Sequence, residues 1–304
     1  MTQTLRDMIA TESARPTFAA AHFFAQHLAE SFGPSVAAVL FYGSCLRQAT
    51  DEGLLLDFYV LVDRMGDAIK NPISAAAGAV LSPNVYYRET QFEGRTLRAK
   101  VAVMTMARFL RDTSSDCFAS SIWARFSQAA LVLNARTPVI QARVQDGLTQ
   151  AIDTMARNTL PLMSATFTAR DLWVQALTCT YGAELRPESA SKAAELVNAD
   201  LARYETVTEA LFGPSVSGAF TNTATDQRAK AERAWYWRRV QGKILNVLRL
   251  IKAAFTFQGG LDYAVWKIER HSGVKMDLTD AERRHPVLTG LKLLPRLMKK
   301  GGLK

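Results

Sequence analysis

A glycine-serine pair and a lone aspartate have the residue types and spacing to do chemistry in this chain. Gly43-Ser44 directly follows an apolar run, and Asp57 lies near the start of the next one. Glycine lets the backbone approach a phosphate closely, and a serine hydroxyl can bind that phosphate. A carboxylate beside it would hold a metal ion. The pattern predicts a nucleotidyltransferase site, although a Gly-Ser pair and a strand aspartate are also common structural features.

The strand of Asp57 lacks the second acid that such transferases usually place two residues later. Residues two apart share a strand face at about 7 Å, so Tyr59 occupies that place. Asp63 has the same parity but lies roughly 20 Å away along the strand. Asp63 is therefore interpreted either as a residue that ends the strand or as a contact to another part of the substrate.

Two cations alternate with apolar residues along residues 96–104. This alternation predicts a strand with Arg98 and Lys100 on one side. Cations on a sheet face suit a triphosphate, but they are equally ordinary on a solvated strand face. Both interpretations stay open from the sequence.

The elements that must position these residues follow from hydrophobic periodicity. Apolar runs at 37–42 and 54–62 predict two strands joined through the Gly-Ser turn and a short helix. A further strand is predicted at 84–88, with a turn at Glu93-Gly94 before the next strand. Helices are predicted at 17–32, 106–134 (with a polar break at 112–116), 141–157, 168–180, 189–212 and 226–255.

Composition limits the class of protein. The 304 residues carry a formal net charge of +9, which favours nucleic acid, nucleotide phosphates or an acidic lipid surface as partners. The three cysteines show no metal-binding or disulfide spacing, which favours a reducing compartment. The N-terminus lacks a signal-peptide pattern. Spanning a bilayer takes about 20 apolar residues, and no run is that long, so any membrane contact is expected to be peripheral.

The last part of the chain is basic and apolar. Arginines and lysines between 233 and 252 are interleaved with Trp235, Tyr236 and Trp237, and a basic tail ends the chain. Beyond Gly259, apolar residues at helical spacing predict an amphipathic helix. This helix would lie in a headgroup layer or dock on its own protein, and the pattern does not choose between them.

Read together, the motifs resemble the Tam41 family, the mitochondrial-type phosphatidate cytidylyltransferases. The matching stretches are Phe41-Tyr42-Gly43-Ser44, Leu56-Asp57-Phe58 with Val62-Asp63, Val85-Tyr86-Tyr87, Gly94-Arg95 to Val101, Leu131 to Val139, Phe167 to Leu172, Tyr181 to Arg186 and Arg249-Leu250-Ile251-Lys252. Each is short, and their shared order over about two thirds of the chain carries the resemblance. Departures from the family pattern include Glu184 for an aspartate, Arg98 and Lys100 in a strand of different sequence, and Arg88 for an asparagine.

The resemblance implies an α/β (α+β) nucleotidyltransferase domain at 1–158, a mainly helical, winged-helix-like domain at 159–258, and a basic amphipathic membrane-associating segment at 259–304. It implies that CTP and phosphatidic acid react with Mg²⁺ to give CDP-diacylglycerol and pyrophosphate. Asp57 and Glu184 would be the catalytic metal ligands. The phosphates would be bound by Gly43, Ser44, Arg98, Lys100 and Arg186.

A bacterial member of this family would be cytoplasmic and peripheral at the inner membrane, and a mitochondrial one would lie on the matrix side. No nucleic-acid partner is expected, and the sequence does not define an oligomeric state. Two alternatives remain: a nucleotidyltransferase that uses another acceptor, or a decayed site in a basic nucleic-acid-binding module whose aromatic residues stack on bases.

Overall fold

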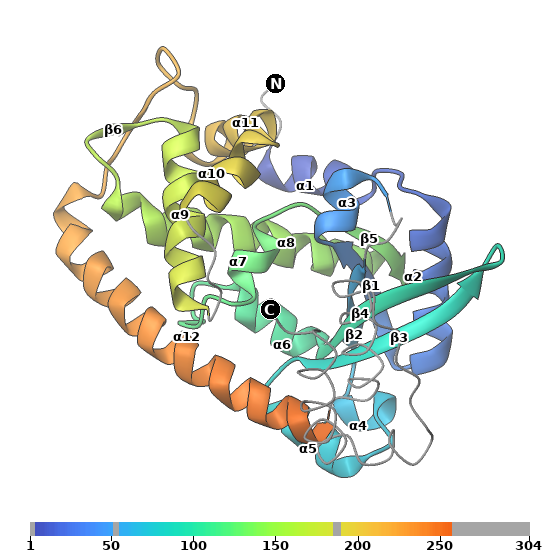
Figure 1. Cartoon of the computed structure of the whole chain (residues 1–304). Coiled ribbons are helices and arrows are strands. Elements are labelled where there is room, and N and C mark those ends of the chain that lie inside the picture. Colours follow the sequence, from blue (N-terminus) through green and yellow to red (C-terminus); the bar gives the residue numbers. More distant parts are fainter. Residues whose placement is uncertain (1–3, 51–54, 185–189, 257–304) are drawn as a thin grey trace, which may run out of the picture. The chain divides into compact units, whose positions relative to one another are not determined.

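The structure is a computed structural model that describes residues 4–50, 55–184 and 190–256 (Figure 1). Its contacts form two compact units, one comprising residues 1–16 with 105–247 (unit 1) and the other residues 17–104 with 248–304 (unit 2). The mixture of helices and strands confirms the predicted α/β class.

The described residues of unit 2 contain four strands and four complete helices. The strands are β1 (Val36–Tyr42), β2 (Leu56–Val62), β3 (Asn84–Phe92) and β4 (Arg95–Thr105), and the helices are α2 (Ala19–Phe32), α3 (Ser44–Gln48), α4 (Met65–Ala68) and α5 (Pro72–Val80). Within this unit the strands lie in the order β3-β4-β2-β1, with antiparallel pairing of β1 with β2 and of β3 with β4. The predicted strands, the helix at 17–32 and the short helix after Gly43 are confirmed.

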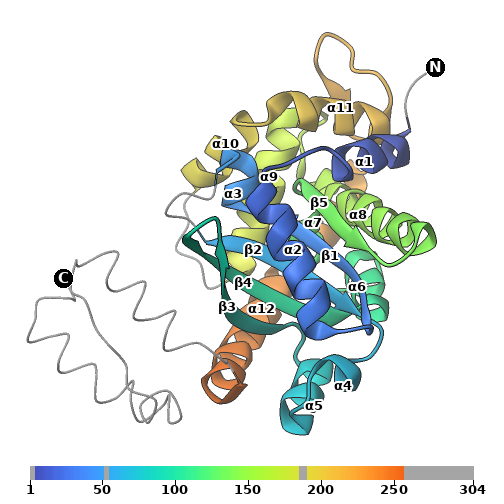
Figure 2. The same ribbon diagram turned by 90° about the vertical axis from the view of Figure 1, so that its right-hand side faces the viewer.

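Helix α2 covers one face of this sheet (Figure 2). Phe24 of α2 stacks on Phe58 of β2 at 5.5 Å between ring centroids, and Phe58 lies 5.2 Å from Phe41 of β1. All three side chains are fully buried. Burying an aromatic side chain stabilises the fold by about 1.5–3 kcal/mol, so this contact decides which face of the sheet is covered.

The β3–β4 hairpin turns at Glu93-Gly94, as predicted. Both residues have positive φ, 48° and 76°, and Phe92 pairs with Arg95 across the turn. This two-residue turn matches the twist of the flanking strands and fixes their register.

Unit 1 is mainly helical. Its described elements before residue 228 are α1 (Leu5–Ser13), α6 (Met106–Thr113), α7 (Trp123–Phe126), β5 (Ala130–Ala135), α8 (Pro138–Thr159), a 3₁₀ turn (Leu160–Leu162), β6 (Thr166–Phe167), α9 (Ala169–Ala183), α10 (Ala190–Asn198), α11 (Leu201–Phe212), β7 (Phe220–Thr221) and a second 3₁₀ turn (Thr225–Gln227). Thr168 and Asp171 form a capping box at the start of α9. The fully buried Trp173 donates its indole N–H to Thr208 of α11 at 2.9 Å, so α9 and α11 share a core.

The prediction of a helical segment over 106–134 is wrong in its second half. Helix α6 ends at Thr113, α7 is a single turn, and residues 130–135 form strand β5. The short apolar run there fits a buried strand as well as a helix, and periodicity alone does not separate the two. The predicted helix at 189–212 is likewise two helices, α10 and α11.

Helix α12 (Arg228–Thr256) is a single 29-residue helix, close to the predicted 226–255 (Figure 1). In the described part of the chain, no helix is both long enough and apolar enough to cross a membrane. The membrane-associating segment predicted at 259–304 lies outside the described residues.

The expected domain boundary near residue 158 lies inside unit 1, where α8 and α9 contact each other. Helices α9, α10 and α11 pack together, and the two-residue strands β6 and β7 pair with each other. The division at 158 and the winged-helix assignment stay predictions.

Candidate functional site

The carboxylate of Asp57 lies against the backbone of Gly43. Tyr42, the residue before that glycine, pairs with Asp57 across the antiparallel β1–β2 ladder. A β-carbon placed on Gly43 would stand only 2.7 Å from Asp57 Oδ2, closer than van der Waals contact allows. Gly43 also has φ 92°, which L side chains rarely adopt. Glycine is therefore required here by both conformation and space.

The turn after β1 is held in place by short-range contacts. Gly43 is the N-cap of α3, and its carbonyl accepts the first helical hydrogen bond from the Arg47 N–H at 3.2 Å. The buried Cys45 thiol donates to the Leu55 carbonyl just before β2, at 3.2 Å. These contacts place Ser44 at the start of α3 and keep the turn beside the first residues of β2. Gly43, Ser44 and Asp57 are all half-buried.

Asp57 lies on the sheet face opposite α2, because side chains alternate along a strand and Phe58 faces α2. Tyr59 shares the face of Asp57 but is only 3% exposed. Its ring centroid lies 5.4 Å from that of Tyr42, so Tyr59 contributes to packing beside the site.

Asp63 directly follows β2 and is exposed, and its N–H donates to the Ser35 carbonyl at 2.9 Å. This position agrees with its interpretation as a residue at the strand end.

Arg98 and Lys100 lie on the same sheet face as Asp57. In β3, Arg88 packs over the ring of Phe32 from α2, at 6.0 Å, so Arg88 faces α2. Arg98 and Lys100 pair with Glu89 and Tyr87, the β3 neighbours of Arg88, and therefore face away from α2. Both cations are half-buried, on the strand adjacent to β2. The structure thus assigns the two cations and the carboxylate to one face.

Glu89 holds Arg98 in position and was not identified from the sequence. Its carboxylate accepts a hydrogen bond from Arg98 Nε at 3.0 Å and one from the Tyr87 hydroxyl at 2.6 Å. Burial, followed by the hydrogen bond to Glu89, raises the pKa of Tyr87 above its ordinary value. The sequence feature that could have identified Glu89 is the two-residue turn at Glu93-Gly94, because this turn sets the register in which residue 89 pairs with residue 98. Arg98 is therefore ion-paired through Nε at a partly exposed position.

The two predicted contributors from the second region are only partly described. Glu184 is the half-buried C-cap of α9 in unit 1, where its N–H donates to the Tyr181 carbonyl at 3.1 Å. Arg186 lies outside the described residues. Within residues 4–50, 55–184 and 190–256, no three His, Cys, Asp or Glu side chains cluster closely enough to hold a metal by themselves.

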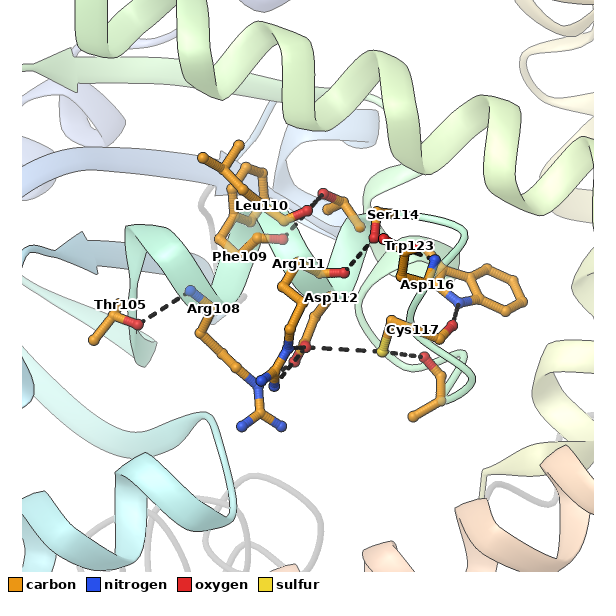
Figure 3. A network of polar contacts seen from close by, with 12 residues as sticks. Thr105, Arg108, Phe109, Leu110, Arg111, Asp112, Ser114, Asp116, Cys117 and Trp123 are labelled. Carbon is orange, nitrogen blue, oxygen red and sulfur yellow. Dashed lines mark hydrogen bonds and ion pairs between the residues drawn. The ribbon is translucent and has the colours of Figure 1, made fainter.

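Unit 1 has a separate polar cluster around the buried Asp112 of α6 (Figure 3). Its carboxylate accepts from Arg108 Nε at 2.6 Å and from Arg111 Nε and Nη2, each at 3.1 Å. The Cys117 thiol lies 3.8 Å from the same carboxylate. Burial, and then the charge of Asp112, raise the pKa of Cys117. Because both arginines converge on one acid, the cluster closes the end of α6 and is interpreted as structural.

Comparisons with protein-family models and with curated proteins found no match. Among solved structures, the chain aligns with a nucleotidyltransferase-like protein from Exiguobacterium sibiricum 255-15 at 11% identity and a TM-score of 0.26. This alignment covers 93% of the present chain and 91% of the other. A similarity this low defines neither the fold family nor the substrate. What the chain shows by itself is a mixed α/β protein with a glycine-carboxylate turn and two cations on one sheet face.

Proposed function

We propose that this protein is a nucleotidyltransferase that transfers the cytidylyl group of CTP to phosphatidic acid. The contact between Asp57 and Gly43, on the sheet face that also carries Arg98 and Lys100, is the observation that supports it. A triphosphate site needs groups that position the phosphates and groups that neutralise their charge. Here the carboxylate and the glycine, which lets the backbone approach a phosphate, would position them, and the two cations would neutralise them. The choice of CTP and of phosphatidic acid rests on the resemblance of the ordered motifs to the Tam41 family.

In the proposed reaction, a phosphate oxygen of phosphatidic acid attacks the α-phosphorus of CTP. A new P–O bond forms, the bond from the α-phosphorus to the bridging β-phosphate oxygen breaks, and pyrophosphate leaves. The nucleophile is already anionic near neutral pH and needs little help from a general base. Gly43 and Ser44 would bind the terminal phosphates, and Arg98 and Lys100 would neutralise the charge on them.

A divalent metal ion fits the half-buried carboxylate of Asp57. Magnesium is commonly held by one or two carboxylates together with substrate phosphates and water, so a single protein carboxylate is compatible with it. When bound, Mg²⁺ would stabilise negative charge on the phosphates. Glu184 and Arg186 remain proposed contributors, as a second ligand and a phosphate contact.

A lipid acceptor would place the enzyme at a membrane surface. The net charge of +9 suits an anionic leaflet, to which each Lys or Arg near the surface contributes about 1 kcal/mol. Peripheral association with the inner membrane is proposed on this basis.

The test uses purified full-length protein, CTP labelled at the α-phosphate, Mg²⁺ and vesicles that contain phosphatidic acid. We expect label to enter the organic phase as CDP-diacylglycerol. Vesicles in which phosphatidylglycerol replaces phosphatidic acid should give none, because that lipid lacks a terminal phosphate monoester.

The Asp57→Asn variant is the matched control, since it removes the charge and keeps the shape of the side chain. If the label instead appears in the aqueous phase, attached to a soluble acceptor, that acceptor and not phosphatidic acid is the substrate. No turnover, together with no Mg²⁺-dependent binding of CTP, would reject the transferase itself.

A further inference from the structure

Helix α12 buries one side and exposes another within unit 1. On the inner side, Trp235 is 2% exposed and donates its indole N–H to the Asn158 carbonyl at 2.9 Å. Arg238, three residues on, is 7% exposed, and its guanidinium lies 5.0 Å from the ring of Trp235 and 4.8 Å from that of Phe118. These contacts fix the rotation of the helix about its own axis.

The opposite side of α12 carries large apolar residues in contact with solvent. Tyr236, Trp237, Ile244 and Val247 are 56%, 60%, 56% and 47% exposed. Trp237 and Ile244 are seven residues apart, and Val247 follows Ile244 by three, so they follow one helix face. We call these four residues the α12 stripe. A row of large exposed apolar side chains is typical of an interaction surface.

The charges of helix α12 itself are almost all positive. The described helix contains eight basic residues and one acidic residue, Glu232, which is paired with Arg228 at 3.1 Å. Of the eight, Arg238 is buried and Lys252 donates to groups of unit 2, so these two do not contribute charge beside the stripe. Arg233 and Lys243 are exposed beside the stripe residues, whereas the side chain of Arg239 lies next to Gly182 of α9. A partner with a negatively charged rim and an apolar interior complements this pattern.

We infer that the α12 stripe docks on a bilayer that contains anionic lipid. Tryptophan and tyrosine favour the headgroup level of a membrane, because their rings are apolar bodies with a polar tip. Helices that lie in this layer combine a basic polar face with aromatic and aliphatic residues on the other face. The exposed Arg233 and Lys243 beside these rings complement anionic headgroups. The inference deepens the proposed function and rests on it for its biological role, but binding is measurable without turnover.

The experiment is sedimentation of the full chain with vesicles, in the absence of CTP and phosphatidic acid. Vesicles of phosphatidylcholine alone are compared with vesicles that also contain phosphatidylglycerol, at low and at raised salt. We expect binding to the anionic vesicles, reduced by salt, and a loss of about tenfold or more in the partition coefficient for Trp237→Gln combined with Ile244→Gln.

The matched control replaces two other exposed valines of unit 1, Val139 (69% exposed) and Val216 (78% exposed), by glutamine. This variant should bind vesicles like the wild type. Three results would overturn the inference: unchanged vesicle binding by the stripe variant, a wild-type dimer that the stripe variant turns into a monomer, or binding of double-stranded DNA that is lost in the same variant. Failure of the proposed chemistry would leave the vesicle result unaffected.

Discussion

The carboxylate of Asp57 lies so close to Gly43 that a β-carbon on this glycine would stand 2.7 Å from Oδ2. The two residues come from different strands, and the pairing of Tyr42 with Asp57 brings them together. The conformation of the turn and the position of the carboxylate are therefore one structural feature.

Replacing this glycine is the first prediction. Gly43→Ala should cost about 1–3 kcal/mol, because φ 92° with ψ −157° is a conformation essentially restricted to glycine. It should lower turnover about 100-fold, because the new β-carbon displaces the carboxylate. Urea unfolding and CTP turnover measure the two effects. Gly94→Ala is the control, since its φ is 76° but no atom lies within 4 Å of the new β-carbon. It should show the stability loss without the loss of turnover, and wild-type turnover in Gly43→Ala would contradict the site.

The charge of Asp57 is the second prediction. Asp57→Asn should lower CTP turnover about 100-fold or more, because the amide removes the charged ligand expected for the metal. Glu184→Gln should cost less, and Asp63→Asn, exposed after the strand, should leave turnover within about threefold. Initial rates at several Mg²⁺ concentrations separate a metal defect from a general one. Wild-type rates in Asp57→Asn would remove the metal role.

The third prediction concerns Glu89, which we interpret as a positioning residue for Arg98. Glu89→Gln weakens the charge-assisted bond to Arg98 Nε, so the guanidinium loses its orientation. We expect the KM for CTP to rise about tenfold, equivalent to about 1.4 kcal/mol, with kcat kept. Glu93→Gln, exposed in the neighbouring turn, should not change KM. A fall in kcat and thermal stability with no change in KM would make Glu89 purely structural.

The fourth prediction is a pH dependence in unit 2. Lys252 donates to the carbonyl of Leu81, to the carbonyl of Pro83 at 2.7 Å and to Asn84 Oδ1 at 3.1 Å. Burial, and then the charge of Arg249, lower the pKa of Lys252 from 10.5 to about 8. The unfolded chain therefore binds more protons between these two values, so this group makes the free energy of unfolding rise with pH in that window.

Chemical denaturation at pH 7 and pH 9.5 measures this effect. The wild type should gain stability relative to Lys252→Met as the pH rises, because the variant has no ammonium to titrate. A constant difference between the two proteins would show that Lys252 titrates at its ordinary pKa.

The fifth prediction concerns the Asp112 cluster of Figure 3. The side chain of Asp112 is 7% exposed and accepts bonds from two arginines, so Asp112→Asn should destabilise the protein by about 2 kcal/mol. Asp153→Asn disrupts a more exposed ion pair with Arg157 and should cost less than about 1 kcal/mol. Urea unfolding of both variants checks the contrast. Equal losses in the free energy of unfolding would show that the buried cluster stabilises the protein no more than a surface ion pair does.

Much of the local structure around the site could be predicted from the sequence. The strands around Gly43 and Asp57 were predictable because an apolar run, a glycine-containing break and a second apolar run leave few other conformations. The turn at Glu93-Gly94 was predictable for the same local reason. Strand β5 was missed because a short buried run has no period of its own.

Side-chain alternation along the sequence placed Asp57 with Tyr59, and Arg98 with Lys100, as pairs. It did not establish that both pairs share a sheet face, since this depends on which side α2 covers. The packing of Phe24 on Phe58 and of Phe32 under Arg88 decided that point. In the same way, the sequence by itself determined that α12 is basic and aromatic. Only the tertiary structure decided that Trp235 is buried and Trp237 exposed, because the rotation of a helix is set by the side chains against which it packs.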